Sequence, residues 1–143
     1  MAFFLGTYRY NMDDRGRIAL PSRYRDMLGS SVIVSQGPDG CLELYPQDEF
    51  ERKAERILSD ATGRQRDRRL GRALFGGAAE AEIDRQGRIL IPPPFRQWAD
   101  LTGPVVLLGQ GRFVEIWSAP RWESESPQVA NDFARGLESV EPR

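Results

Sequence analysis

The chain has 143 residues, of which 40% are hydrophobic and 10% aromatic, as in a globular protein of one ordinary domain or two very small ones. It contains no histidine and one cysteine, Cys41, which excludes histidine-based catalysis, an internal disulfide and a thiolate or imidazole zinc site. No apolar run approaches the roughly 20 residues that cross a bilayer, and the apolar start is too short for a signal peptide. We therefore expect a cytoplasmic protein with no membrane association, no metal and no other cofactor.

The formal net charge of −1 is unevenly distributed along the chain. Up to Trp122 there are 18 basic and 16 acidic residues, whereas two basic and five acidic residues follow. The body is therefore mildly basic, and the acidity lies in the tail. Of the 20 basic residues 19 are arginine, which fits a GC-rich genome and also fits forked side chains that bind phosphates and guanine edges. The two explanations are compatible.

Residues 12–28 repeat at 83–99, with an offset of 71 and six identities in 17 positions, where chance gives roughly one. The match resumes downstream, where residues 32–34 resemble 105–107 and residues 41–45 resemble 113–117. The chain is therefore an internal duplication. The identical pairs are Asp13/Asp84, Gly16/Gly87, Arg17/Arg88, Ile18/Ile89, Pro21/Pro92 and Arg25/Arg96.

Each copy predicts four short strands and one helical turn. A turn ending in glycine joins the first two strands, and proline ends the second. A single copy of about 45 residues has too small a core, so we expect the copies to interlock as a built-in dimer. The predicted strands are Thr7–Met12, Arg17–Leu20, 32–34 and 41–45, then Ala79–Ile83, Arg88–Ile91, 105–107 and 113–117, with helical turns at Ser22–Leu28 and Pro94–Leu101.

Helical sequence connects the two copies. Residues 46–60 carry an amphipathic face, and residues 64–75 carry apolar side chains behind an arginine cluster. Past Trp122 we expect a weak helix around Val129–Leu137 or a frayed end. The predicted fold is α+β, mainly β with short helices. Its predicted parts are module 1 (7–54), a helical linker (55–77), module 2 (78–126) and a polar acidic tail (127–143).

An aspartate and an arginine four residues apart span each glycine turn, as Asp13 with Arg17 and as Asp84 with Arg88. An aspartate in a tight turn caps backbone N–H groups and also holds an arginine fork in one orientation. A fork held in this way loses less entropy on binding a phosphate or a guanine edge. A purely structural tie within the hairpin would look the same from sequence alone.

The other charged and aromatic residues have less specific interpretations. The arginine run of residues 64–72 contacts DNA phosphates, forms a solvated face, or forms salt bridges to Glu49, Glu51 and Glu55. We expect Cys41 to be a small core residue and Glu43 and Glu115 to lie on the polar faces of their strands. The tryptophans are expected to fill the core and subunit contacts, namely Trp98, Trp117 and Trp122.

The motifs resemble the MraZ family of proteins. The segment Phe4-Leu5-Gly6-Thr7 followed by residues 13–25 (Asp-Asp-Arg-Gly-Arg-Ile-Ala-Leu-Pro-Ser-Arg-Tyr-Arg) is similar to the family's opening. Residues 84–92 (Asp-Arg-Gln-Gly-Arg-Ile-Leu-Ile-Pro) are similar to its second repeat. The resemblance covers residues from about 4 to 122. The family often has lysine at the position of Arg15 and a histidine or similar polar residue near Tyr10, and the acidic tail lies outside the match.

The resemblance implies two tandem AbrB-like swapped-hairpin modules that form an intrachain pseudo-dimer. It also implies a ring-shaped homo-oligomer that binds direct repeats in the promoter of its own operon, in the division and cell-wall gene cluster, and represses it. Such a protein would be nucleoid-associated, with double-stranded DNA as its partner and no small-molecule substrate. The implied DNA-contacting residues are Arg15, Arg17, Arg85 and Arg88, with Asp13 and Asp84 as their organisers.

Two alternatives differ in function. An antitoxin-like protein would bind DNA with the same module and a protein partner with its tail, although such antitoxins usually carry one module. An enzyme would use Asp13 and Asp84 as paired carboxylates. An arginine four residues after each aspartate holds it ionised and makes it a poor proton donor, so we expect no catalytic residues.

Overall fold

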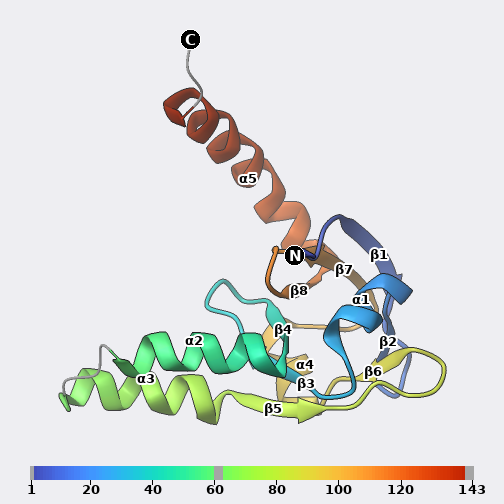
Figure 1. Ribbon diagram of the computed structural model, residues 1–143. Coiled ribbons are helices and arrows are strands. Elements are labelled where there is room, and N and C mark those ends of the chain that lie inside the picture. Colours follow the sequence, from blue (N-terminus) through green and yellow to red (C-terminus); the bar gives the residue numbers. More distant parts are fainter. Residues whose placement is uncertain (1, 60–62, 141–143) are drawn as a thin grey trace.

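Two antiparallel sheets form the body of the computed structural model, which describes residues 2–59 and 63–140 (Figure 1). The larger sheet has the order β1-β7-β8-β4-β3-β5, and the smaller sheet pairs β2 with β6. The fold is therefore α+β, as predicted. Its strands are β1 (Thr7–Asn11), β2 (Arg17–Ala19), β3 (Val32–Gln36), β4 (Leu42–Pro46), β5 (Ala78–Ala81), β6 (Arg88–Leu90), β7 (Pro104–Gly109) and β8 (Val114–Ser118). Its helices are α1 (Ser22–Leu28), α2 (Gln47–Ser59), α3 (Gln65–Gly76), α4 (Pro93–Ala99) and α5 (Ala119–Val140).

The first strand of each copy pairs with the third strand of the other copy. Thus β1 pairs with β7, with Thr7 opposite Leu108, and β5 pairs with β3, with Ala81 opposite Val32. The second strands β2 and β6 pair with each other, and so do the last strands β4 and β8. The two copies therefore interlock as swapped hairpins, which confirms the fold expected from the duplication.

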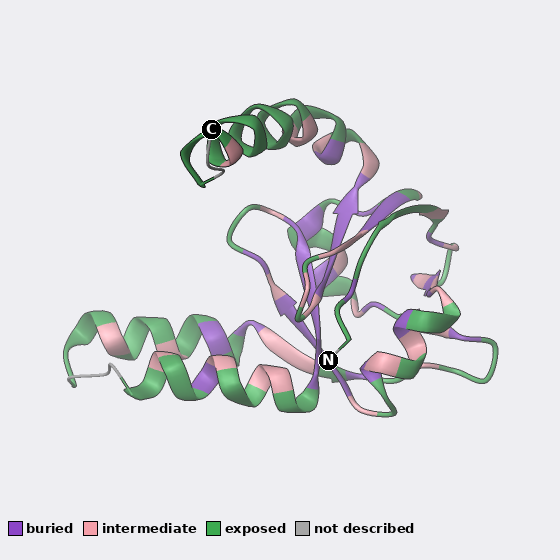
Figure 2. Cartoon of the chain, turned by 45° about the horizontal axis from the view of Figure 1, so that its top comes forward, coloured by how far each residue is buried: buried purple, intermediate pink, exposed green. Residues whose placement is uncertain are grey.

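A single core cluster takes side chains from both copies. Ile18 and Ile89 meet in register on β2 and β6 and are both fully buried. The equivalent aromatic residues of α1 and α4, Tyr24 and Phe95, are buried in the same cluster. In Figure 2 the buried residues concentrate in the sheets, while α2, α3 and α5 are largely exposed. Sharing one core gives each small copy the apolar burial that it lacks alone.

Most predicted elements are present with shifted ends. α1 has its predicted bounds, whereas α4 begins at Pro93 and ends at Ala99. β5 ends at Ala81, and the predicted final residue Ile83 forms an isolated bridge with Ile89. The predicted helices at 46–60 and 64–75 are α2 and α3, although residue 60 lies outside the described residues. The predicted boundaries at 54 and 126 fall inside α2 and α5.

The C-terminal segment differs from its prediction, since α5 is a continuous helix of 22 residues rather than a short or frayed one. Trp122 anchors its beginning, because this side chain is buried and its ring lies 5.6 Å from that of Trp117. Pro127 removes one backbone donor without ending the helix. Beyond that point α5 projects from the body with Val129 and Phe133 exposed (Figure 1). Among the described helices, none has the length and apolarity that spanning a membrane requires.

Cys41 is fully buried, as predicted, and Trp117 and Trp122 pack in the same small cluster. Trp98 differs, because 41% of it is exposed. Its indole Nε1 donates to the carbonyl oxygens of Gly37 and Cys41 at 3.1 and 3.2 Å, which ties α4 to the turn before β4. Core placement is therefore confirmed for Trp117 and Trp122, whereas Trp98 lies at the surface, where the predicted subunit contacts stay a prediction.

The prediction of polar-face positions is also wrong for Glu43 and Glu115, which are 6% exposed and lie directly opposite each other on β4 and β8. These two strands are in the middle of the larger sheet, where side chains on both faces are covered. Glu43 accepts hydrogen bonds from Tyr45 Oη at 2.9 Å and from Lys53 Nζ at 3.0 Å. Glu115 accepts one from Trp117 Nε1 at 2.9 Å.

The two buried glutamates differ in whether a positive side chain offsets their charge. Glu43 forms an ion pair with Lys53, whereas Glu115 forms none with any described residue. Burial raises the pKa of Glu115 above its usual value, and repulsion from Glu43 raises it further. Folding therefore shifts Glu115 toward its protonated form relative to the unfolded chain. The raised pKa of Glu115 stabilises the folded protein fully at pH values below the pKa that this carboxyl has in the unfolded chain. This stabilisation is lost as the pH rises through the pKa of Glu115 in the folded protein.

We expect Glu115→Gln to raise the thermal unfolding midpoint at pH 8 by about 2–4 °C, which corresponds to roughly 1 kcal/mol. The amide carbonyl still accepts from Trp117, while the buried charge opposite Glu43 is removed. Differential scanning calorimetry at pH 8 and at pH 4.5 measures the effect, which should be smaller at the lower pH.

Glu138→Gln, an exposed change on α5, is the matched control and should leave the midpoint within about 1 °C of the wild type at both pH values. A Glu115→Gln midpoint below that of the wild type at pH 8 would show that the ionised carboxylate stabilises the strand pair.

Candidate nucleic-acid interface

The β2–β6 ribbon places two arginines on the outside of the molecule. Side chains alternate between the faces of a strand, so the inward Ile18 and Ile89 require their neighbours to point outward. Arg17 lies opposite Leu90 and Arg88 lies opposite Ala19 in the register. The two guanidinium groups therefore share the outer face of a rigid strand pair whose inner face is the core.

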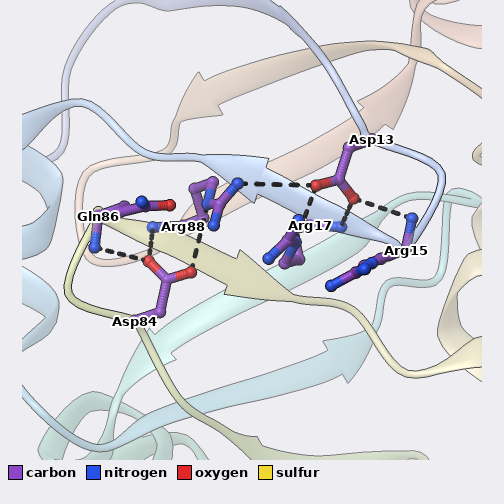
Figure 3. A network of polar contacts seen from close by, with 6 residues as sticks. All are labelled: Asp13, Arg15, Arg17, Asp84, Gln86 and Arg88. Carbon is purple, nitrogen blue, oxygen red and sulfur yellow. Dashed lines mark hydrogen bonds and ion pairs between the residues drawn. The ribbon is translucent and has the colours of Figure 1, made fainter.

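Asp13 organises the first glycine turn (Figure 3). Its Oδ1 accepts hydrogen bonds from the backbone N–H groups of Arg15 and Arg17 at 3.0 and 2.8 Å. Its Oδ2 accepts from the Nε of Arg17 at 2.8 Å. The Gly16 N–H donates to the Asp13 carbonyl at 3.0 Å and closes the turn. One carboxylate thus fixes both the backbone of the turn and the side chain of the arginine that follows.

Asp84 repeats this arrangement in the second turn (Figure 3). It accepts from the backbone N–H groups of Gln86 and Arg88, both at 2.9 Å, and from Arg88 Nε at 3.3 Å. Arg88 Nη1 also lies 3.9 Å from Asp13 Oδ2, which links the two turns across the ribbon. The structure therefore brings four of the six predicted site residues into one network.

The remaining two predicted residues, Arg15 and Arg85, lie in the same turns and are exposed. The Arg15 backbone is held by Asp13, but among the described residues neither guanidinium forms an ion pair or a hydrogen bond. Two oriented and two unpaired arginine side chains thus surround one ribbon. This set can bind anions, and its forks have the geometry for phosphate or guanine recognition.

Hydrogen bonds from the backbone N–H groups of Arg17 and Arg88 are the main cause that lowers the pKa of Asp13 and Asp84 below the usual value. The arginine side chains lower these pKa values further. Both carboxylates are therefore ionised acceptors at neutral pH and poor proton donors. Within the described residues, no group of histidine, cysteine, aspartate or glutamate has the arrangement of a metal site.

Each turn also has a contact that the sequence analysis did not assign. Gly16 and Gly87 have φ angles of +84° and +78° and are buried. The side chain of Arg96 lies against Gly16, and that of Arg25 lies against Gly87. These arginines occur as an identical pair in the duplication, and that identity was the signal available in the sequence.

The arginine run lies on α3, at the end of the molecule opposite the β2–β6 ribbon (Figure 1). Arg68 Nη1 donates to the Gly63 carbonyl at 2.7 Å. Among the described residues no ion pair joins this run to Glu49, Glu51 or Glu55, so the alternative of salt bridges to α2 is not the one observed. Glu49 pairs with Arg52 and Arg112 instead. The arginine side chains form a solvated face far from the turns.

Comparisons with known proteins place this arrangement in context. A family model described as "MraZ protein, putative antitoxin-like" matches residues 3–73 and again residues 74–139. The chain is 44% identical over 121 residues to the transcriptional regulator MraZ of Roseiflexus castenholzii, covering 85% of each chain. It is 45% identical over 131 residues to that of Lachnoclostridium phytofermentans, covering 92% of each. It is 38% identical over 138 residues to that of Mycoplasmoides gallisepticum, covering 96% of this chain and 97% of the relative.

We expect Asp13→Ala to loosen the first turn, because two backbone N–H groups and the Nε of Arg17 lose their acceptor. Loss of a cap of this kind costs about 1 kcal/mol. Amide hydrogen exchange measured by NMR should show faster exchange at Arg15 and Arg17, with the core strands unaffected.

Asp14→Ala is the control, because the Asp14 side chain is exposed in the same turn and accepts no hydrogen bond from a described residue. It should change stability by less than about 0.5 kcal/mol. Equal exchange rates at Arg15 and Arg17 in the two variants would contradict the organising role of Asp13.

Proposed function

This chain belongs to the MraZ family of transcriptional regulators, and we propose that it binds double-stranded promoter DNA through the outer face of the β2–β6 ribbon. The observation that carries the proposal is the pair of arginine forks, Arg17 and Arg88, each fixed by a carboxylate of its own turn. We propose Arg15 and Arg85 as further DNA contacts and Asp13 and Asp84 as the organisers.

Fixed forks favour recognition of a defined ligand. The side chains of Arg17 and Arg88 are only 27% and 29% exposed, and each is held by an aspartate. They have therefore already lost much of their rotamer freedom. Binding then costs less ordering entropy than it would for free surface arginines. A planar fork also makes two parallel hydrogen bonds to a phosphate or to guanine O6 and N7, which a lysine does not.

We propose that several chains act together as a ring-shaped homo-oligomer on direct repeats. A mildly basic body supports weak binding by one chain, and several ribbons presented together gain affinity through effective concentration. On this proposal the protein acts at the nucleoid, in the cytoplasm, and represses its own operon in the division and cell-wall gene cluster. Repression follows when the occupied repeats exclude the transcription machinery.

An antitoxin-like role is the second candidate, favoured by the exposed apolar side chains of α5. Val129, Phe133 and Val140 are 46%, 66% and 73% exposed on a helix that projects from the body. In this role the ribbon still binds DNA while α5 binds a protein partner. Co-purification of a second protein in fixed stoichiometry would favour it. We propose no catalytic activity for either candidate.

We expect the double variant Arg17→Ala/Arg88→Ala to lose about 100-fold in affinity for promoter DNA, since each fork contributes about 1–3 kcal/mol. Fluorescence anisotropy on labelled DNA from upstream of the protein's own operon measures the loss, at several salt concentrations and beside a scrambled duplex. Wild-type affinity should fall steeply as salt rises.

Two control variants make the loss specific. Arg69→Ala/Arg72→Ala removes the same charge from exposed positions on α3 and should retain most of the affinity. Arg17→Lys/Arg88→Lys keeps the charge without the forks and should bind promoter and scrambled DNA with similar affinity. Failure of the intact, oligomeric wild type to bind DNA at low salt would refute the proposed function.

A further inference from the structure

Arg25 and Arg96 occupy equivalent positions on α1 and α4 and cross over to the opposite copy. Arg25 belongs to the first copy and lies against Gly87 of the second, while Arg96 of the second lies against Gly16 of the first. The backbone crosses in the same way, because Leu20 N donates to Gly87 O at 3.0 Å and Ile91 N donates to Gly16 O at 2.8 Å. Each turn is therefore contacted by the strand end and the helix of the other copy.

The contact is close, and the positive φ angles of Gly16 and Gly87 favour glycine at both positions. A Cβ atom built at Gly87 would lie 2.5 Å from Arg25 Nη1, and one built at Gly16 would lie 2.7 Å from Arg96 Cζ. The guanidinium group thus fills the space in which any other residue would place its side chain. It lies directly beside the turn that carries the proposed DNA contacts.

Neither guanidinium has a partner among the described residues. The Nε atoms of Arg25 and Arg96 are buried and unsatisfied, and neither side chain forms an ion pair with a described carboxylate. A half-buried cation without compensation is costly, and a buried donor without an acceptor calls for an explanation. The Nε atoms themselves are out of reach of a ligand, whereas the outer nitrogens of both guanidinium groups are not buried, so they leave two equivalent cationic groups beside the ribbon open to an external anion.

We propose that Arg25 and Arg96 bind DNA backbone phosphates that flank the ribbon. The arginine that binds a phosphate beside each turn then comes from the other copy of the repeat. This inference rests on the proposed function. Arg17 and Arg88 lie at the centre of the ribbon, and the crossing arginines extend the basic surface past each glycine turn. A phosphate there accepts from the outer nitrogens of the guanidinium.

The two sites differ in their surroundings. An open pocket of about 440 Å³ beside Arg96 is also lined by Asp13, Asp14 and Asp100, whose charges oppose an incoming phosphate. Gly87, against which Arg25 lies, follows Arg85 and Gln86 in its turn, which add a positive and a neutral side chain. Arg25 is therefore the stronger of the two sites and the better position to test.

The test compares Arg25→Gln and Arg25→Lys with the wild type in full-length protein, by anisotropy on the promoter duplex over a range of salt concentrations. Each lost phosphate contact makes the slope of log affinity against log salt shallower by about 0.9. We expect Arg25→Gln to show a shallower slope and about tenfold weaker binding, and Arg25→Lys to recover most of the slope. Arg135→Gln, the same charge loss at an exposed position on α5, should keep the wild-type slope.

A side chain that acts as a structural brace for the turn gives a different result. In that case Arg25→Gln lowers the thermal unfolding midpoint and weakens binding with an unchanged salt slope, and Arg25→Lys is as defective as Arg25→Gln. Either finding would overturn the proposal while leaving the DNA-binding function in place. Failure of the wild type to bind any duplex would instead remove the proposed function itself.

Discussion

Each copy of the repeat leaves its own sheet incomplete, and the first strand of the other copy completes it through the β1–β7 and β3–β5 pairings. This exchange forces β2 and β6 together, because they follow the exchanged strands through turns of a few residues. Ile18 and Ile89 then meet in the core and leave Arg17 and Arg88 outside. The ribbon is therefore a product of the exchange and would not exist in one copy alone.

The same exchange adds contacts that restrain the turns. A short loop on a surface is ordinarily mobile, since few contacts oppose its motion. Here each turn is held from within by an aspartate, from below by a backbone hydrogen bond to the other copy, and from the side by a crossing arginine. A positive φ angle at glycine permits the close approach that these contacts need.

The interlocked fold followed from the sequence because a repeat with identities at regular positions predicts equivalent structure twice. The ribbon arginines were predicted for the same reason. Glu43 and Glu115 were misassigned because their burial depends on the elements that cover both faces of the sheet. The alternation of polar and apolar residues along a strand does not indicate such cover. α5 was predicted too short because its anchor is the packing of Trp122 on Trp117, a tertiary contact. Arg25 and Arg96 were matched as a pair, but their contacts lie in the other copy and no local pattern indicates them.

Joining the two copies in one chain has a further consequence, since it allows the two turns to differ. The positions after Asp13 are Asp14 and Arg15, whereas those after Asp84 are Arg85 and Gln86. A dimer of identical single modules would present two equal ends and would suit a palindrome. The two ends of this ribbon instead carry their charges at different positions of the turn, so the ribbon has a direction along any duplex that it contacts. Chains arranged head to tail would then match sequences that recur in the same orientation, and the linker between the copies becomes the source of that polarity.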